Sequence, residues 1–324
     1  MRIVNFAAAA AVALGPSVAS AQPSKPPFAL PPESITVTSV KPSDETISSF
    51  VETRNAPTRF LGKMARWRRP VCPLTVGLGD KYAKFVTQRI RDVAAAVGAP
   101  VNADPACKPN IEVVFTTTPQ AFMDNLRKTG RAFLGYHDSN AQADALAIVT
   151  HPIQAWYTTE SLDMNGQGQV DSGLCSGPSI NLLQLASFGI GGLSVQQNVQ
   201  LNLTCATAMR WTGSRLSNGY DSGFNNVLVV AEPAKLFDFE VGSLADYITM
   251  MGLSQAASLD SCQQLPSISN MLAKGCASAA SKITDGDLAY LQGLYRVPTG
   301  YSLSGQRDEM RYEMKKILVT DKGN

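Results

Sequence analysis

Six cysteines follow an amino-terminal segment typical of a secretory leader, and this combination constrains the chain more than any other feature. Arg2 precedes a short apolar run over residues 6–14, and Ala19-Ser20-Ala21 matches an A-x-A cleavage site, which predicts a mature start at Gln22. Pro16 interrupts the run, and no later segment approaches the ~18 unbroken apolar residues that a membrane helix needs. We therefore expect a periplasmic or secreted protein whose mature chain has no transmembrane segment.

The six cysteines predict disulfides before metal ligands, because their number is even and the expected compartment is oxidising. No C-x-x-C occurs, which disfavours a zinc ribbon and a thioredoxin-like redox site. Pairing in sequence order keeps each bridge within one local unit, and it predicts Cys72–Cys107, Cys175–Cys205 and Cys262–Cys276.

Composition excludes one broad class of function. The formal net charge is only +2, and Arg2 leaves with the leader. A general nucleic-acid binder needs a clustered positive surface, so we expect no nucleic-acid partner. The 324 residues are 44% hydrophobic, enough for a substantial core, and the low charge with 25 Gly is typical of a loop-rich exported protein.

Composition and hydrophobic periodicity divide the chain into segments of one domain. The predicted segments are a signal peptide at 1–21, a Pro-rich flexible segment at 22–33, an α/β part at 34–160, an irregular insertion at 161–223, a helical part at 224–318 and a tail at 319–324. The predicted fold class is α+β, with a mixed β-sheet, flanking helices, zincin-like order and a disulfide-closed insertion.

The individual elements follow from alternating, helical and capping patterns. Strands are expected at 34–40, 73–78, 110–116, 145–150, 153–159 and 225–231, with shorter ones near 195–204 in the insertion. Helices are expected from Asp44, over 81–97, from Pro119, over 180–188, over 241–253, from Thr284 and over 306–318. In the 81–97 helix we expect a buried stripe that begins with Tyr82 and Phe85.

Residues 63–70, KMARWRRP, form a basic cluster around a tryptophan. One interpretation is a surface patch for lipid head groups or another polyanion. The other is an edge strand with Ala65, Trp67 and Val71 pointing inward and the arginines pointing outward.

The stretch 241–253 has an apolar stripe typical of a buried helix. Its segment ADYITMMG resembles the H-E-x-x-H-x-x-G helix of zincin metallopeptidases, with Ala245 and Thr249 in the places of the histidines and Asp246 in that of the glutamate. DLAYLQGLY (287–295) likewise resembles the carboxy-terminal helix of matrixin-type zincins. An ordinary core helix without zincin ancestry is the alternative.

The resemblance implies a zincin fold over roughly residues 70–300 without catalytic zinc, since Ala245 cannot bind metal and Thr249 is a poor ligand. The chain also resembles uncharacterised secreted bacterial proteins in RWRRPVCPLTVGL, CKPNIEVVF, VLVVAEPAKL and LADYITMMGL, which implies no known activity. A remnant cleft would have the 241–253 helix as its floor, with Asp246, Thr249 and Met250 exposed beside Ala245.

Two further groups of residues are candidate sites. Asp163, Asn165 and Asp171 resemble a calcium loop, but Leu174 stands where a bidentate acid is needed, and a β-hairpin with an Asn-Gly turn explains the same residues. The histidines, His137 and His151, lie in turn-like contexts and are expected to be solvated.

Three functions remain open. The first is a non-enzymatic pseudo-zincin that needs no cofactor and binds a peptide or cell-envelope component. The second is a hydrolase with a non-zincin site that combines Asp246, Thr249 and His137. The third is a structural envelope protein that acts through the 161–223 insertion.

Overall fold

The computed structural model describes residues 41–171, 180–181, 200–201, 203 and 219–320. The leader, the Pro-rich segment and the predicted strand at 34–40 lie outside these ranges. Within them, no helix combines the length and apolarity that crossing a membrane would require.

A mixed five-stranded sheet forms the centre of the described structure. Its strand order is β1 (Pro73–Val76), β2 (Ile111–Phe115), β7 (Asp221–Ala231), β3 (Ile153–Leu162) and β4 (Gly168–Val170). The first three strands are parallel, whereas β3 runs antiparallel to both β7 and β4. The predicted α+β class with a mixed sheet and flanking helices is confirmed.

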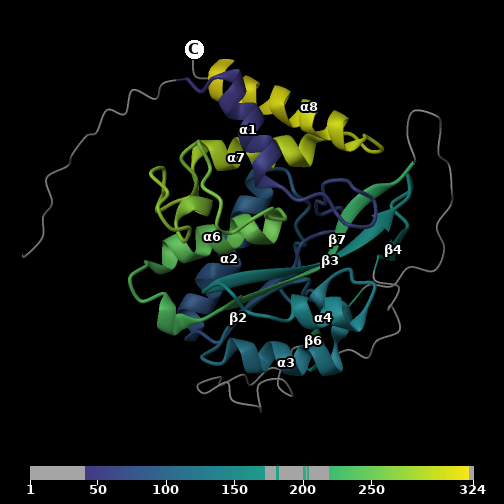
Figure 1. Ribbon diagram of the computed structural model, residues 1–324, viewed down its shortest axis with the longest axis vertical. Helices are drawn as coiled ribbons and strands as arrows, with labels where there is room; N and C mark the ends of the chain where they lie inside the picture. The colour runs from purple at the N-terminus through teal and green to yellow at the C-terminus, as the bar shows by residue number, and fades with distance from the viewer. Residues whose placement is uncertain (1–40, 172–179, 182–199, 202, 204–218, 321–324) are drawn as a thin grey trace, which may run out of the picture. The chain divides into compact units, whose positions relative to one another are not determined.

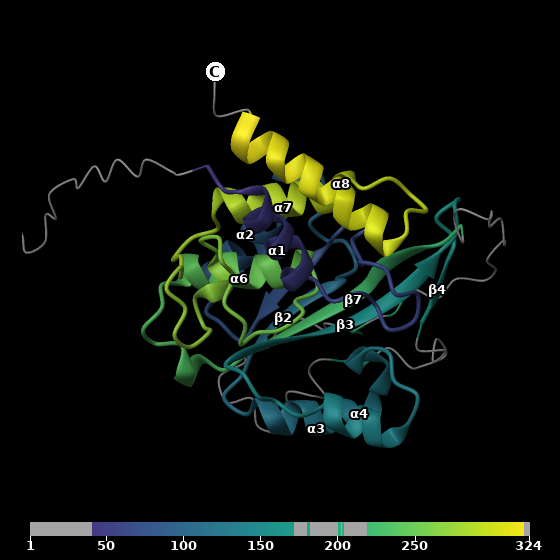
Figure 2. The same cartoon turned by 45° about the horizontal axis from the view of Figure 1, so that its top comes forward.

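Helices cover both faces of this sheet (Figures 1 and 2). One face carries α2 (Asp80–Ala96) and α6 (Val241–Leu253), with α1 (Asp44–Arg54), α7 (Asp285–Arg296) and α8 (Leu303–Lys315) beyond them. The other face carries α3 (Pro119–Thr129), the short η1 (Arg131–Leu134) and α4 (Asn140–Leu146). The remaining elements are β5 (Ile180–Asn181), β6 (Gln200–Leu201), η2 (Pro233–Lys235), η3 (Ile268–Asn270) and a last turn, η4 (Lys316–Thr320).

The strand β7 shows why two cores form. Val227 and Val229 pack in the core under α6, whereas Leu228 and Val230 pack in the core against α3. Successive side chains of a strand point to opposite faces, so an uninterrupted apolar run requires a cover on each.

The expectation of a strand over residues 145–150 is wrong. Residues 145–150 form no strand: the Ser139 hydroxyl accepts from Gln142 N at 3.3 Å and starts α4, which ends at Leu146. Ala143 and Ala147 then pack in the second core, and Ile148 is 53% exposed. A helix cap and small buried side chains therefore prevail over the local β-propensity of the Ile-Val-Thr run.

The stripe of α2 also begins later than predicted. Val86, Ile90 and Val93 are buried, but Tyr82 and Phe85 are 51% and 47% exposed. They belong to the first turns of α2, and Phe85 faces an open pocket beside α6 instead of the core.

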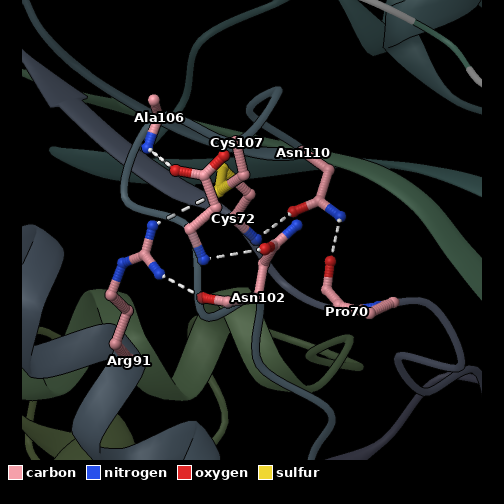
Figure 3. The surroundings of a disulfide bond; sticks show 8 residues. Pro70, Cys72, Arg91, Asn102, Ala106, Cys107 and Asn110 are labelled. Atoms are coloured by element: carbon pink, nitrogen blue, oxygen red, sulfur yellow. Dashed lines mark hydrogen bonds between the residues drawn. A yellow bond between two sulfur atoms is a disulfide. The ribbon is translucent and has the colours of Figure 1, made fainter.

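Two of the three predicted disulfides, Cys72–Cys107 and Cys262–Cys276, are confirmed. The first ties the start of β1 to the loop before β2 (Figure 3). Asn110 Oδ1 accepts from Cys72 N at 2.7 Å, and Arg91 donates to Asn102 O at 2.7 Å, so the surrounding loop is held from both sides (Figure 3). The predicted Cys175–Cys205 bridge lies outside the described residues.

Strands of the sheet extend into both ends of the segment predicted as an insertion, 161–223. The strand β3 continues to Leu162, β4 follows, and β7 already begins at Asp221. Ile180–Asn181 pairs with Gln200–Leu201, which fits the predicted strand near 195–204 but not a helix starting at Ile180. At the carboxyl end, the last turn extends to Thr320, into the predicted tail.

Candidate functional site

The helix α6 is buried, although we predicted an exposed side. Ala245 and Thr249 are 0% exposed and Met250 is 1% exposed, so the expectation that they line an open cleft is wrong. The helix contacts α2 and η3 as well as the strands β7 and β3. The Thr249 hydroxyl donates to Ala245 O at 2.7 Å, which satisfies it within the helix.

Asp246 is also buried, and it connects three segments. Its Oδ1 accepts from Arg89 Nε of α2 at 2.5 Å, and its Oδ2 accepts from Ile283 N, just before α7, at 2.8 Å. Both carboxylate oxygens are therefore engaged by protein donors. Asp246 therefore links α2, α6 and the segment before α7.

An open pocket of about 390 Å³ lies where α2 passes the first turn of α6. It is lined by Phe85, Gln88, Arg89, Asp92, Glu240, Gly242, Ser243, Asp246, Ser281 and Lys282. Its wall carries basic and acidic groups around one half-exposed aromatic ring. An external ligand can reach this part of the α6 region.

The structure does not bring His137 to Asp246. His137 follows η1, whose Phe133 and Leu134 pack in the core on the sheet face opposite α6. Its Nδ1 lies 2.8 Å from Gly135 O. His151 is also separate, with Nε2 3.1 Å from Asp260 Oδ1. A site that combines Asp246, Thr249 and His137 is not formed.

The residues that resemble a calcium loop, Asp163, Asn165 and Asp171, lie in a β-hairpin formed by β3 and β4. A hairpin with an Asn-Gly turn was the alternative interpretation of this segment. Asp163 Oδ1 accepts from Asn165 N at 2.8 Å and Gln167 N at 2.9 Å, and Gly166 takes a φ of 76° in the turn. Asp171 accepts from the hydroxyls of Thr159 and Ser161 instead of facing that turn. The described ranges contain no group of three or more His, Cys, Asp or Glu placed to hold a metal ion.

The basic cluster fits the edge-strand interpretation only in part. Arg66 pairs with Gly223 of β7 in a parallel bridge, and Ala65 and Trp67 are buried, as an edge strand predicts. Arg66, however, is also buried, at 1% exposed, and donates to Asp221 Oδ2 at 3.2 Å. Its inward direction was missed because the partner carboxylate lies far along the chain, where no local pattern reveals it.

A second open pocket, of about 340 Å³, lies against this segment. We call it the arginine pocket, and it is lined by Arg66, Trp67, Arg68, Arg69, Gly98, Pro100, Leu162, Met164, Asn165, Gly166 and Tyr295. Four separate segments therefore build it, and no local pattern in the sequence predicts that they meet.

Comparison of the chain with protein-family profiles, with curated proteins and with solved structures finds no match. The zincin resemblance and the likeness to secreted bacterial proteins remain predictions.

Proposed function

We propose that the protein is a non-enzymatic binding protein of the periplasm or the extracellular space. Its ligand would be a peptide or another cell-envelope component, held in the pocket beside the first turn of α6. The proposed protein is a pseudo-zincin, in which a helix with the pattern of a catalytic element serves as scaffold.

The single observation that carries the proposal is that the side chains of α6 at the zincin-like positions are buried or bound to neighbouring segments. Ala245 and Thr249 are packed away from solvent, and the oxygens of Asp246 accept hydrogen bonds from Arg89 and Ile283. Each Asp246 oxygen accepts one hydrogen bond from a structural donor, so this carboxylate links α2, α6 and the segment before α7. The groups at the helix stabilise the fold, which leaves recognition as the role of its open end.

The chemistry of the pocket favours a ligand with both charges. Arg89 and Lys282 supply positive groups, Asp92 and Glu240 supply negative groups, and Phe85 supplies an apolar surface. Its volume of about 390 Å³ falls in the range of small-ligand pockets. A short peptide segment, with an amine, a carboxylate and a side chain, presents matching groups.

Site-specific photocrosslinking tests this proposal. Phe85 is replaced by benzoylphenylalanine in the exported full-length chain, cells are irradiated, and adducts are identified by mass spectrometry. We expect one class of peptide or envelope adduct at position 85, and we expect Lys282→Gln in the same chain to reduce its yield severalfold.

Tyr312 provides the matched control, because it is an aromatic residue on α8 with 63% of its surface exposed. The same probe at position 312 should not capture that adduct. Equal adducts at both positions, or no effect of Lys282→Gln, would contradict a ligand in this pocket.

A further inference from the structure

The arginine pocket contains a buried cation whose hydrogen-bonding capacity is only partly used. Arg66 Nη2 donates to Asp221 Oδ2 at 3.2 Å, but Arg66 Nε and Nη1 are buried with no acceptor among the described residues. Buried donors are almost always paired, and a buried guanidinium needs acceptors to offset its lost hydration. Burial is also the main reason that the Arg66 pKa is lowered.

The carboxylates around Arg66 accept hydrogen bonds from other residues. Asp221 Oδ1 accepts from Gly300 N at 2.8 Å. Glu160 binds Arg69 in a bidentate pair, with Nε–Oε1 at 2.8 Å and Nη2–Oε2 at 3.1 Å. Its Oε2 also accepts from Asn225 Nδ2 at 2.8 Å. Neither carboxylate is placed to serve the remaining donors of Arg66.

The local charge is positive. Lys63, Arg66, Arg68 and Arg69 are the cations here, and the carboxylates are Asp221, Glu160 and Asp163 of the hairpin turn, so four positive charges face three negative ones. The carboxylate of Asp171 belongs to the other side of β3, with Thr159 and Ser161. Arg68 lies at the exposed side of the pocket, where its Nη2 donates to the neutral Thr299 hydroxyl at 3.1 Å.

We propose that the arginine pocket binds the phosphate group of a small ligand. Phosphate has more acceptor oxygens than a carboxylate, and guanidinium groups match its geometry. Arg66 would bind it from the floor of the pocket and Arg68 from the rim. The volume of about 340 Å³ exceeds that of a phosphate ion, and Trp67, Leu162, Met164 and Tyr295 provide walls for an attached organic group.

Isothermal titration calorimetry on the mature protein tests this site with inorganic phosphate, sn-glycerol 3-phosphate and acetate. We expect saturable binding of one equivalent of at least one phosphate compound and none of acetate. Arg68→Gln, at an exposed position, should weaken that binding at least about tenfold, the effect of losing a charge-assisted hydrogen bond. Vesicles with phosphatidylglycerol, compared with pure phosphatidylcholine, show whether a lipid head group is the source.

Arg131→Gln is the matched control, because it removes the same charge from η1 on the other face of the sheet. It should leave phosphate binding unchanged, as should Lys282→Gln in the pocket beside α6. Retained affinity in Arg68→Gln, an equal loss in Arg131→Gln, or no binding of any phosphate compound would overturn the proposal. Since the two pockets share no lining residue, failure here leaves the crosslinking test of the first pocket intact.

Discussion

At the scale of single residues, Glu112 is the most unusual group. It lies on β2 and is 1% exposed, and its Oε2 accepts from Asn226 Nδ2 of β7 at 2.7 Å. Its Oε1 and Asn226 Oδ1 are both buried acceptors without a partner among the described residues. Burial raises the pKa of Glu112 from 4.5 to about 8. A proton on Oε1 that is shared with Asn226 Oδ1 would satisfy both atoms, so we infer a neutral acid–amide pair.

The raised pKa sets the direction of a pH effect. Below pH 4.5 the carboxyl is protonated in both the folded and the unfolded chain, and its contribution to stability is fully present. Between 4.5 and about 8 the unfolded chain releases the proton while the folded chain retains it. The free energy of unfolding therefore falls across this window, by on the order of 3 kcal/mol at neutral pH.

Glu112→Gln should remove this loss, because the amide reproduces the neutral acid and can still pair with Asn226. Urea unfolding should show the variant more stable than the parent by on the order of 3 kcal/mol near pH 7 and similar to it near pH 4.5. Glu45→Gln, at an exposed position on α1, is the control. A constant difference between the parent and Glu112→Gln at all pH values would refute a buried neutral acid.

At the scale of elements, packing and hydrogen bonds from neighbouring segments hold α6 in place. It packs against α2, β7 and β3, and Trp67 Nε1 and Tyr295 Oη donate to the carbonyls of Gly252 and Leu253 at 2.8 Å each. These bonds satisfy carbonyl groups at its carboxyl end, where a helix lacks internal donors. The helix is therefore an anchor to which the basic segment and α7 both attach.

Asp246→Asn tests this role of α6. It removes the charge that pairs with Arg89 and weakens the acceptor for Ile283 N, so the free energy of unfolding should fall by about 1–2 kcal/mol, reduced by the partial exposure of Arg89. Asp92→Asn, in the same pocket but exposed, should stay within about 0.5 kcal/mol of the parent. Chemical denaturation measures the free energy of unfolding of both variants. Equal stability of the two would contradict a structural role for Asp246.

At the scale of the whole molecule, the described disulfides restrain different lengths of chain. Cys72–Cys107 spans 35 residues and encloses β1 and α2, whereas Cys262–Cys276 spans 14 residues of loop around η3. Cross-links act mainly by restricting the unfolded chain, so the longer span has the larger effect.

Replacing both cysteines of a pair by alanine should show that the disulfide with the longer span stabilises the protein more. The Cys72/Cys107 variant should lose roughly 4 kcal/mol of unfolding free energy and the Cys262/Cys276 variant roughly 3 kcal/mol, as measured by urea unfolding under oxidising conditions. A smaller loss for the longer span would show that local packing, such as that of Asn110 and Arg91, outweighs chain entropy.

The sequence by itself determined the elements whose signals are local. The apolar runs of β2 and β7, the capping box of Thr284 and Asp287, and two disulfides between neighbouring cysteines were all predictable and are present. Each depends on residues close together in the chain, or on periodicity that only one secondary structure satisfies.

Only the tertiary structure decided which of these residues face solvent and which charges meet. Asp246 and Thr249 look exposed in a helical projection, yet α2 and the segment before α7 cover them. Arg66 looks like a surface cation, yet Asp221 lies 155 positions away in sequence and binds it in the interior. Burial and pairing arise from contacts between distant segments. Because of these contacts, α6 is a buried structural helix, and the candidate sites lie in the pockets beside it.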